Sequence, residues 1–298
     1  GVTPLINALD NRRFDIAMLL LDKGANPNVW DMSGRTPLYV AVDMKSLTPR
    51  VARGDRRGVS ASDGPRESPA SSRVTAMEVI TRLLDMNVDV DHQLTRKRPY
   101  STGRGRFEDY DLRGGVGPLF LASIRQDHEA VAALIAHGAE VDLPNVAQMT
   151  PLMVALGMTV TGRAPNDVAP APGGDVQGRA IKTVDLLLAG GANINAQVLG
   201  SRTRTGILQT YIPGRDREGR TALFAAAEAG RAQEVEHLLK RGADPTVRDA
   251  TGKTALDWAR APAPSAGGVG AAIDVATPAE RAATVALLEA TLVSKAAN

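Results

Sequence analysis

The sequence predicts an all-α solenoid, a row of six helix-turn-helix units joined by β-hairpin turns, in which all 298 residues form one domain. Two recurring motifs lead to this prediction. Gly-x-Thr-Pro-Leu, or a close variant, occurs six times, and its first two copies place Thr3 and Thr36 33 residues apart. Gly-Ala followed by Asn, Asp or Glu, or a variant, comes after each of the first five copies. Such a period is typical of units that stack because none can bury its apolar face alone.

Each part of the unit has a physical reason. Thr before Pro supplies an oxygen that caps the first helix, and Pro at the first helical position loses no N–H that the helix needs. The second helix carries a Leu stripe, as in Leu238 and Leu239, and Gly then ends it by adopting a left-handed conformation. The expected units are approximately 1–30, 31–91, 92–144, 145–195, 196–248 and 249–298.

Three stretches closely resemble the ankyrin repeat: GVTPLINALDNRRFDIAMLLLDKGANPNVWD, GRTPLYVAVD and GRTALFAAAEAGRAQEVEHLLKRGADPTVRD. The resemblance covers six units and implies an ankyrin-repeat solenoid that binds another protein. GRTPLYVAVDMKSLTPR and similar stretches also resemble the long-loop ankyrin proteins of environmental bacteria, many of which are exported. This second resemblance favours a periplasmic or secreted location over the cytoplasmic alternative.

Alternate units carry insertions. Units two, four and six have extra residues between their helices, at 46–73, 159–178 and about 261–277, with a loop-like composition of Pro, Gly, Ala and Arg. The turns after units two and four span 30 residues, from 87 to 117 and from 191 to 221, against 12 in a plain unit, so each gains 18. We expect these turns to form two extended hairpin fingers. At an offset of 104 residues, Arg98 corresponds to Arg202 and Phe107 to Tyr211.

The composition argues against catalysis and against a cofactor. The chain has no Cys, and its four His share no ligand spacing, so no metal site is expected. No nucleophile, base and orienting group converge at a readable spacing. No apolar run approaches the roughly 20 residues that span a membrane, so no membrane insertion is expected. A net charge of +2 makes nucleic acid an unlikely partner, although the fingers mix cations with aromatic side chains.

The expected function is non-catalytic binding of another protein through the concave face and the fingers. The candidate contact residues in the fingers are Arg98, Tyr100, Arg104, Phe107, Tyr110, Arg202, Arg204 and Tyr211. Candidates in the turn before unit two are Trp30, Met32 and Arg35. Candidates at the ends of first helices, on the inner face, are Asp43, Met44, Ile124 and Arg125. Exposed aromatic residues, Met and Arg are enriched at protein interfaces, but Trp30 has the alternative of packing on the neighbouring finger.

Two other functions remain open at this point. The chain is alternatively a structural or self-assembling segment of a larger exported complex, or an accessory region of an enzyme whose catalytic part lies outside it. We also expect a repeat before Gly1, because unit one is as apolar as an internal unit, and a terminal repeat normally has a polar outer face.

Overall fold

The computed structural model describes residues 1–46, 74–95, 114–158, 176–200, 217–261 and 276–297. Across these ranges the chain is helical and contains no strand. The helices, in chain order, are α1 (Pro4–Asp10), α2 (Phe14–Asp22), α3 (Pro37–Ser46), α4 (Ala76–Asp85), α5 (Pro118–Ile124), α6 (His128–Ala136), α7 (Pro151–Ala155), α8 (Val176–Ala189), α9 (Ala222–Ala229), α10 (Ala232–Lys240), α11 (Ala255–Arg260) and α12 (Pro278–Ala297).

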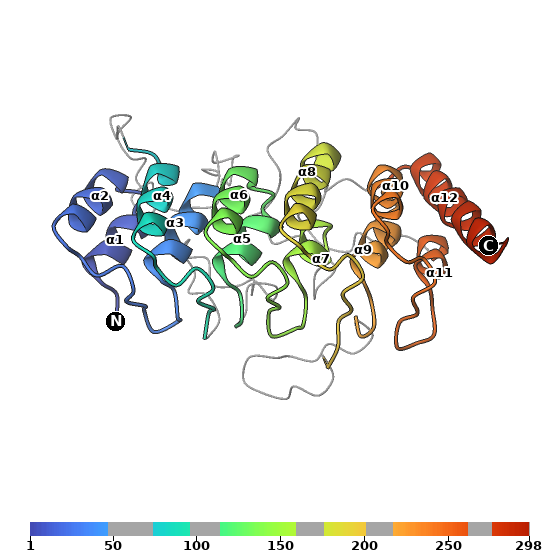
Figure 1. Ribbon diagram of the computed structural model, residues 1–298, viewed down its shortest axis with the longest axis horizontal. Helices are drawn as coiled ribbons and strands as arrows, with labels where there is room; N and C mark the ends of the chain where they lie inside the picture. The colour runs from blue at the N-terminus through green and yellow to red at the C-terminus, as the bar shows by residue number, and fades with distance from the viewer. Residues whose placement is uncertain (47–73, 96–113, 159–175, 201–216, 262–275, 298) are drawn as a thin grey trace, which may run out of the picture.

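The helices form an elongated stack of two layers, with the N-terminus at one end and the C-terminus at the other (Figure 1). Each odd-numbered helix pairs with the even-numbered helix that follows it, as α1 does with α2 and α3 with α4. The odd-numbered helices also contact one another in order and form an inner layer, while the even-numbered helices form an outer layer. The predicted fold, an all-α ankyrin-type solenoid, is confirmed.

The helix boundaries follow the motifs. The hydroxyl of Thr3 accepts a hydrogen bond from the Ile6 N–H at 3.2 Å, and Thr36 accepts one from the Tyr39 N–H at 3.2 Å. Gly24 follows α2 with φ +84°, the left-handed conformation that ends an outer helix. Asn87 takes the same role after α4 with φ +51°, which Asn tolerates better than most residues.

One continuous apolar core runs along the stack from Leu5 to Leu288. In five units, the third residue of the inner helix is large and fully buried. These residues are Ile6, Tyr39, Phe120, Met153 and Phe224. Three of these residues are aromatic, so the chain's few aromatic side chains supply bulk at one structural position in α3, α5 and α9.

A ladder of side-chain hydrogen bonds joins neighbouring units at the turns that follow the outer helices. In each case an Asn or Asp oxygen of one unit accepts the backbone N–H of an equivalent residue in the next unit. The pairs are Asn28 with Asp89 at 3.4 Å, Asp91 with Glu140 at 3.0 Å, Asp142 with Asn193 at 2.8 Å and Asn195 with Asp244 at 2.8 Å. These bonds fix the register of the stack at four successive junctions.

Asp91 is one of the residues of this ladder. Substituting it can separate the effect of its charge on stability from the effect of its hydrogen bond to the Glu140 N–H. Burial raises the pKa of Asp91, and the nearby Asp89 carboxylate raises it further. A raised pKa means that protonation of Asp91 favours the folded state below the pKa of the unfolded chain, and that this advantage is lost as the pH rises through the folded pKa. At neutral pH the charge on Asp91 is therefore unfavourable, although its oxygens are needed.

We expect Asp91→Asn to raise the free energy of unfolding at pH 7 by a few tenths of a kcal/mol, because it keeps an acceptor oxygen and removes the charge. Asp91→Ala should instead lower it by about 1 kcal/mol, because the Glu140 N–H loses its partner. Urea titrations at pH 7 and pH 4 measure both effects. A loss of stability with Asn at pH 7 would show that the charge itself supports the junction.

The bases of the two fingers have matching geometry. The Leu94 N–H donates to the Val116 carbonyl at 3.1 Å, and the Val198 N–H donates to the Arg220 carbonyl at 3.0 Å, 104 residues further along. Gln93 and Gln197 strengthen these bases, since each amide group donates to a glycine carbonyl 22 residues away. The fingers themselves, at 96–113 and 201–216, lie outside the described residues.

Three details differ from the sequence-based expectation. The turns carry isolated backbone pairs, such as the Asp31 N–H with the Arg35 carbonyl at 3.1 Å, and in the described residues no β-strand forms. The insertion expected at 159–178 ends earlier, because α8 already begins at Val176. Ser46, assigned to the first insertion, is the last residue of α3.

Candidate interaction surface

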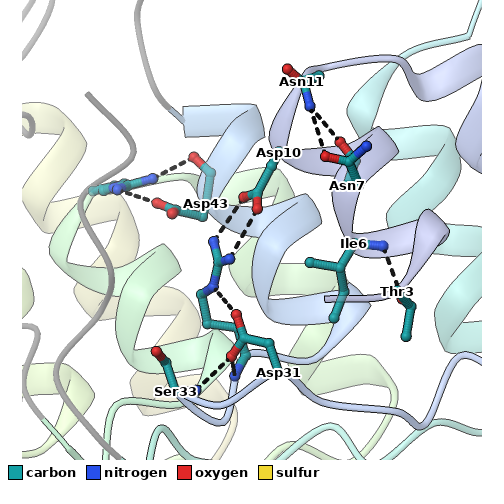
Figure 2. Close-up of polar contacts among 10 residues, drawn as sticks. Thr3, Ile6, Asn7, Asp10, Asn11, Asp31, Ser33 and Asp43 are labelled. Carbon is teal, nitrogen blue, oxygen red and sulfur yellow. Dashed lines mark hydrogen bonds and ion pairs between the residues drawn. The ribbon is translucent and has the colours of Figure 1, made fainter. Parts of the chain in front are cut away.

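The turn between α2 and α3 presents two large apolar side chains to solvent. Trp30 is 52% exposed and Met32 is 74% exposed. Asp31 between them is buried, and its carboxylate accepts hydrogen bonds from the Ser33 N–H at 2.8 Å and the Arg35 N–H at 3.0 Å (Figure 2). Because Asp31 is held inside the turn, its two neighbours along the chain are directed outward.

Arg35 locks this turn onto unit one. Its guanidinium group donates to both oxygens of Asp10, at 2.7 and 2.9 Å, and to Asp31 at 2.7 Å. Figure 2 shows Asp10 of α1 and Asp31 of the turn approaching the same guanidinium group. Burial opposes the charge on Arg35, but the two carboxylates outweigh burial and raise the pKa of Arg35. Arg35 therefore stays charged and positions the turn.

The exposed Trp30 rests on the next unit. Its indole ring stacks on the His92 imidazole with 5.0 Å between ring centroids and an interplanar angle of 30°. His92 Nδ1 lies 3.5 Å from the Asp89 carboxylate. The Thr95 N–H donates to the Ser33 carbonyl at 3.1 Å, so the two turns are also joined through their backbones. Trp30 thus packs on His92, before the first finger, and still keeps half its surface exposed; its expected packing on the finger itself lies outside the described residues.

Five predicted contact residues are buried, which corrects the expectation that they are exposed: Arg35, Asp43, Met44, Ile124 and Arg125. Arg125 forms an ion pair with the Asp43 carboxylate at 2.5 Å and donates to the Asp43 carbonyl at 2.5 Å. Burial lowers the pKa of the nearby Arg12, Asp43 opposes this shift and Arg125 reinforces it. These charges join units one to three.

The inner layer as a whole offers little exposed surface in the central units. All residues of α5 and α7 are buried, and so are Pro37–Met44 of α3 and Ala222–Ala227 of α9. The described residues of these helices therefore leave little of the inner face exposed for the contact that the sequence predicts.

The abundance of Arg has a structural role as well. Arginines donate to carbonyl groups at the C-terminal end of an inner helix in a neighbouring unit, where a cation also meets the negative end of the helix dipole. The pairs are Arg12 with Met44, Arg125 with Asp43, Arg179 with Gln126, Arg231 with Leu156 and Arg281 with Glu228. The sequence showed an excess of Arg over Lys without indicating this use.

Eight further candidates fall in the fingers and lie outside the described residues: Arg98, Tyr100, Arg104, Phe107, Tyr110, Arg202, Arg204 and Tyr211. Sequence reasoning missed two residues of the turn edge, His92 and Asp89. Their signal was available, because both fall in the turn aligned with the one that carries Trp30. It is a weak signal, since the repeat pattern does not say which side chains of adjacent turns touch.

The described residues contain no group of three or more potential metal ligands. In the same ranges, no helix is both long and apolar enough to cross a bilayer. An open groove lies between the turn at 242–245 and α12. Lys295 crosses it and donates to Asp244 at 2.7 Å, and this bond, with those from Thr246, lowers the pKa of Asp244 to about 2. The groove is closed in part by the chain's own ion pair.

Comparisons with known proteins agree with this architecture. The family model described as "Ankyrin repeat" matches residues 1–32, and the one described as "Ankyrin repeats (many copies)" matches residues 212–259. Among solved structures, the crystal structure of EF0377, an ankyrin repeat protein, is similar with a TM-score of 0.53 at 19% sequence identity, over 87% of this chain and 91% of that chain. At this identity the likeness shows the fold alone. The two family matches and the shared fold together show that the chain contains ankyrin repeats at residues 1–32 and 212–259 and has an ankyrin-repeat fold.

Proposed function

We propose that this chain binds another protein, without catalysis, through the turn edge of units one and two. Ankyrin repeats generally act as protein–protein interaction modules. The observation that carries the proposal is the exposure of Trp30 and Met32 on a turn that Asp31 and Arg35 hold rigid. Large apolar side chains held in place before binding lose little conformational entropy on contact, which favours affinity.

The same edge carries both fingers, because their bases continue the row of turns at Thr95 and Gly200. Contact through Phe107 and Tyr211 stays a prediction that extends this surface. The buried inner helices take no part in the proposed contact. The carboxylates of Asp10 in α1 and Asp43 in α3 pair with Arg35 and Arg125 and so stabilise the stack.

A photo-crosslinking residue at position 32 tests the proposal, with Lys240, 69% exposed on α10, as the control position. We expect position 32 to crosslink one protein that position 240 does not. The identified partner is then purified. We expect Trp30→Ala to weaken its binding about 30-fold, corresponding to a hot spot of about 2 kcal/mol.

The matched control is Val293→Ala, which truncates a 71% exposed apolar side chain at the far end of α12 and should change the dissociation constant less than twofold. Circular dichroism verifies that both variants keep their helical content. A partner that binds Trp30→Ala and the parent chain equally well would place the contact elsewhere.

A further inference from the structure

The free face of Trp30 lies beside negative charge. One face of the indole ring stacks on His92, and the ring keeps about half of its surface exposed. Asp89, in contact with the same His92, has a side chain that is 64% exposed. An exposed indole face attracts cations through its quadrupole, and Trp does so more strongly than Tyr or Phe. An aromatic face next to a carboxylate therefore suits a cationic side chain.

The charge extends along the edge. Asp85 ends α4, and the turns that follow α4 and α6 carry four more carboxylates: Asp89, Asp91, Glu140 and Asp142. Burial, and then the Asp89 carboxylate, raise the pKa of Asp91, as expected where negative charges are crowded. Two histidines lie close to these carboxylates. His92 and His137 are 3.5 and 3.8 Å from Asp89 and Asp85, respectively.

Among the residues that the structure describes, Arg35, Arg82 and Lys23 are the basic residues to consider around Trp30, and each is paired or lies at a distance. Arg35 is buried and bonded to Asp10 and Asp31. Arg82 pairs with Asp22 at 3.5 Å, on the outer helices. Lys23 lies at the opposite end of the turn from Trp30, beside the end of α2. The described part of the surface next to the indole face is thus negative, and phosphate groups or an acidic segment would meet repulsion there.

We propose that the partner contacts this edge with a basic segment, placing an Arg or Lys side chain over the free face of Trp30 with Asp89 and Glu140 beside it. This inference rests on the proposed function and adds the chemistry of the partner. Met32 contacts the aliphatic part of the same segment, because long cationic side chains carry an apolar stem. Charge complementarity of this kind speeds association and selects against acidic partners.

Dye-labelled peptides test the inference by fluorescence anisotropy. The probe is a twelve-residue peptide of alternating Arg and Gly-Ser spacers, compared with peptides in which Gln or Glu replaces every Arg. We expect the Arg peptide to bind at least tenfold more tightly than the Gln peptide, and the Glu peptide not to bind. Raising NaCl from 50 to 300 mM should weaken the Arg peptide several-fold, because exposed charges are screened.

Variants locate the binding. Trp30→Ala should weaken the Arg peptide about tenfold, and Asp89→Asn with Glu140→Gln about fivefold. The control Glu236→Gln removes a carboxylate that is 48% exposed on α10 and should leave binding unchanged. Equal binding of the Gln and Arg peptides would overturn the proposal. Unaltered binding of the Arg peptide by Trp30→Ala would also overturn it, because the peptide would then bind through the charge of the protein surface and not through the Trp30 ring.

The two proposals fail in different ways. If the partner crosslinked at position 32 depends on Trp30 but its crosslinked segment is neutral or acidic, the basic-segment inference is wrong and the proposed function stands. If the partner binds the Trp30→Ala variant as tightly as the parent chain, the proposed function is wrong. A crosslinked segment that carries an Arg or Lys needed for binding supports both.

Discussion

Replacing Gly115 with Ala is expected to lower the free energy of unfolding by about 3 kcal/mol, combining a strained backbone with overpacking. Gly115 has φ +80°, and a Cβ there would lie 2.7 Å from the Val146 nitrogen and 3.0 Å from the Asn145 carbonyl carbon. Both are backbone atoms of the next unit's turn, so no side chain can rotate away to make room. Urea denaturation followed by circular dichroism gives the midpoint and the slope.

Gly252 supplies a matched control. It occupies the equivalent position with φ +81°, but a Cβ there would meet nothing within 4 Å. Gly252→Ala should therefore cost only about 1 kcal/mol, the conformational part of the effect. Equal losses from both variants would mean that the turn at 145–146 moves aside freely and that close stacking of the turns contributes little.

Gln148 shows what this packing demands. It stands where Gly34, Gly115 and Gly219 stand in other units, and it has φ +61° with a side chain present. At those three glycines the turn of the next unit donates a backbone hydrogen bond to the residue just before the glycine, as Val146 does to Gly114 at 3.2 Å. Among the described residues, no such bond joins Leu199 to the Gln148 turn, and Leu199 is 60% exposed. The side chain at Gln148 thus coincides with the loss of the backbone hydrogen bond that joins the turns at the other three junctions.

The repeat order, the helix pairs and their caps were predictable because they depend on local chemistry. Thr3 caps α1 and Gly24 ends α2 through contacts within a few residues, which a single unit of sequence contains. The matched finger bases were also within reach of the sequence. Plain turns carry Asp31, Asn145 or Asp249, whose carboxylate or amide oxygen closes the turn. The two long turns carry buried Leu94 and Val198 at that position.

Exposure at the candidate site was less predictable, because it depends on contacts between units. The repeat pattern places Arg35 on a turn and Asp43 at the end of an inner helix, where solvent contact is reasonable. Arg35 instead reaches Asp10, 25 residues earlier, and Asp43 meets Arg125, 82 residues later. Spacing within one unit holds no information on such pairs. Trp30 and Met32 are exposed, because no described residue of the neighbouring units covers them fully.

Arg35 offers the second large effect, and it connects stability with the proposed contact. Arg35→Met is expected to lower the free energy of unfolding by about 3 kcal/mol, because it leaves a buried carboxylate without its cation. The side chain of Asp31 is only 2% exposed, so water cannot replace the guanidinium group there, whereas Asp10 is 26% exposed and can be rehydrated. Met keeps most of the apolar volume, so the loss reports on charge rather than on a cavity.

Two further variants isolate the cause. Arg13→Met removes an arginine whose ion pair with Asp15 is 44% exposed on both sides, and it should cost less than about 0.5 kcal/mol. Asp31→Asn in the Arg35→Met background should recover part of the loss, because the buried group is then neutral and still accepts the backbone N–H groups of Ser33 and of position 35. Hydrogen exchange at Ser33 and Thr95 follows the same turn locally. Because this turn carries Trp30 and Met32, Arg35→Met should also weaken binding of the partner, whereas Arg13→Met should leave binding unchanged. Unchanged exchange and unchanged partner binding would show that the turn keeps its shape without the clamp.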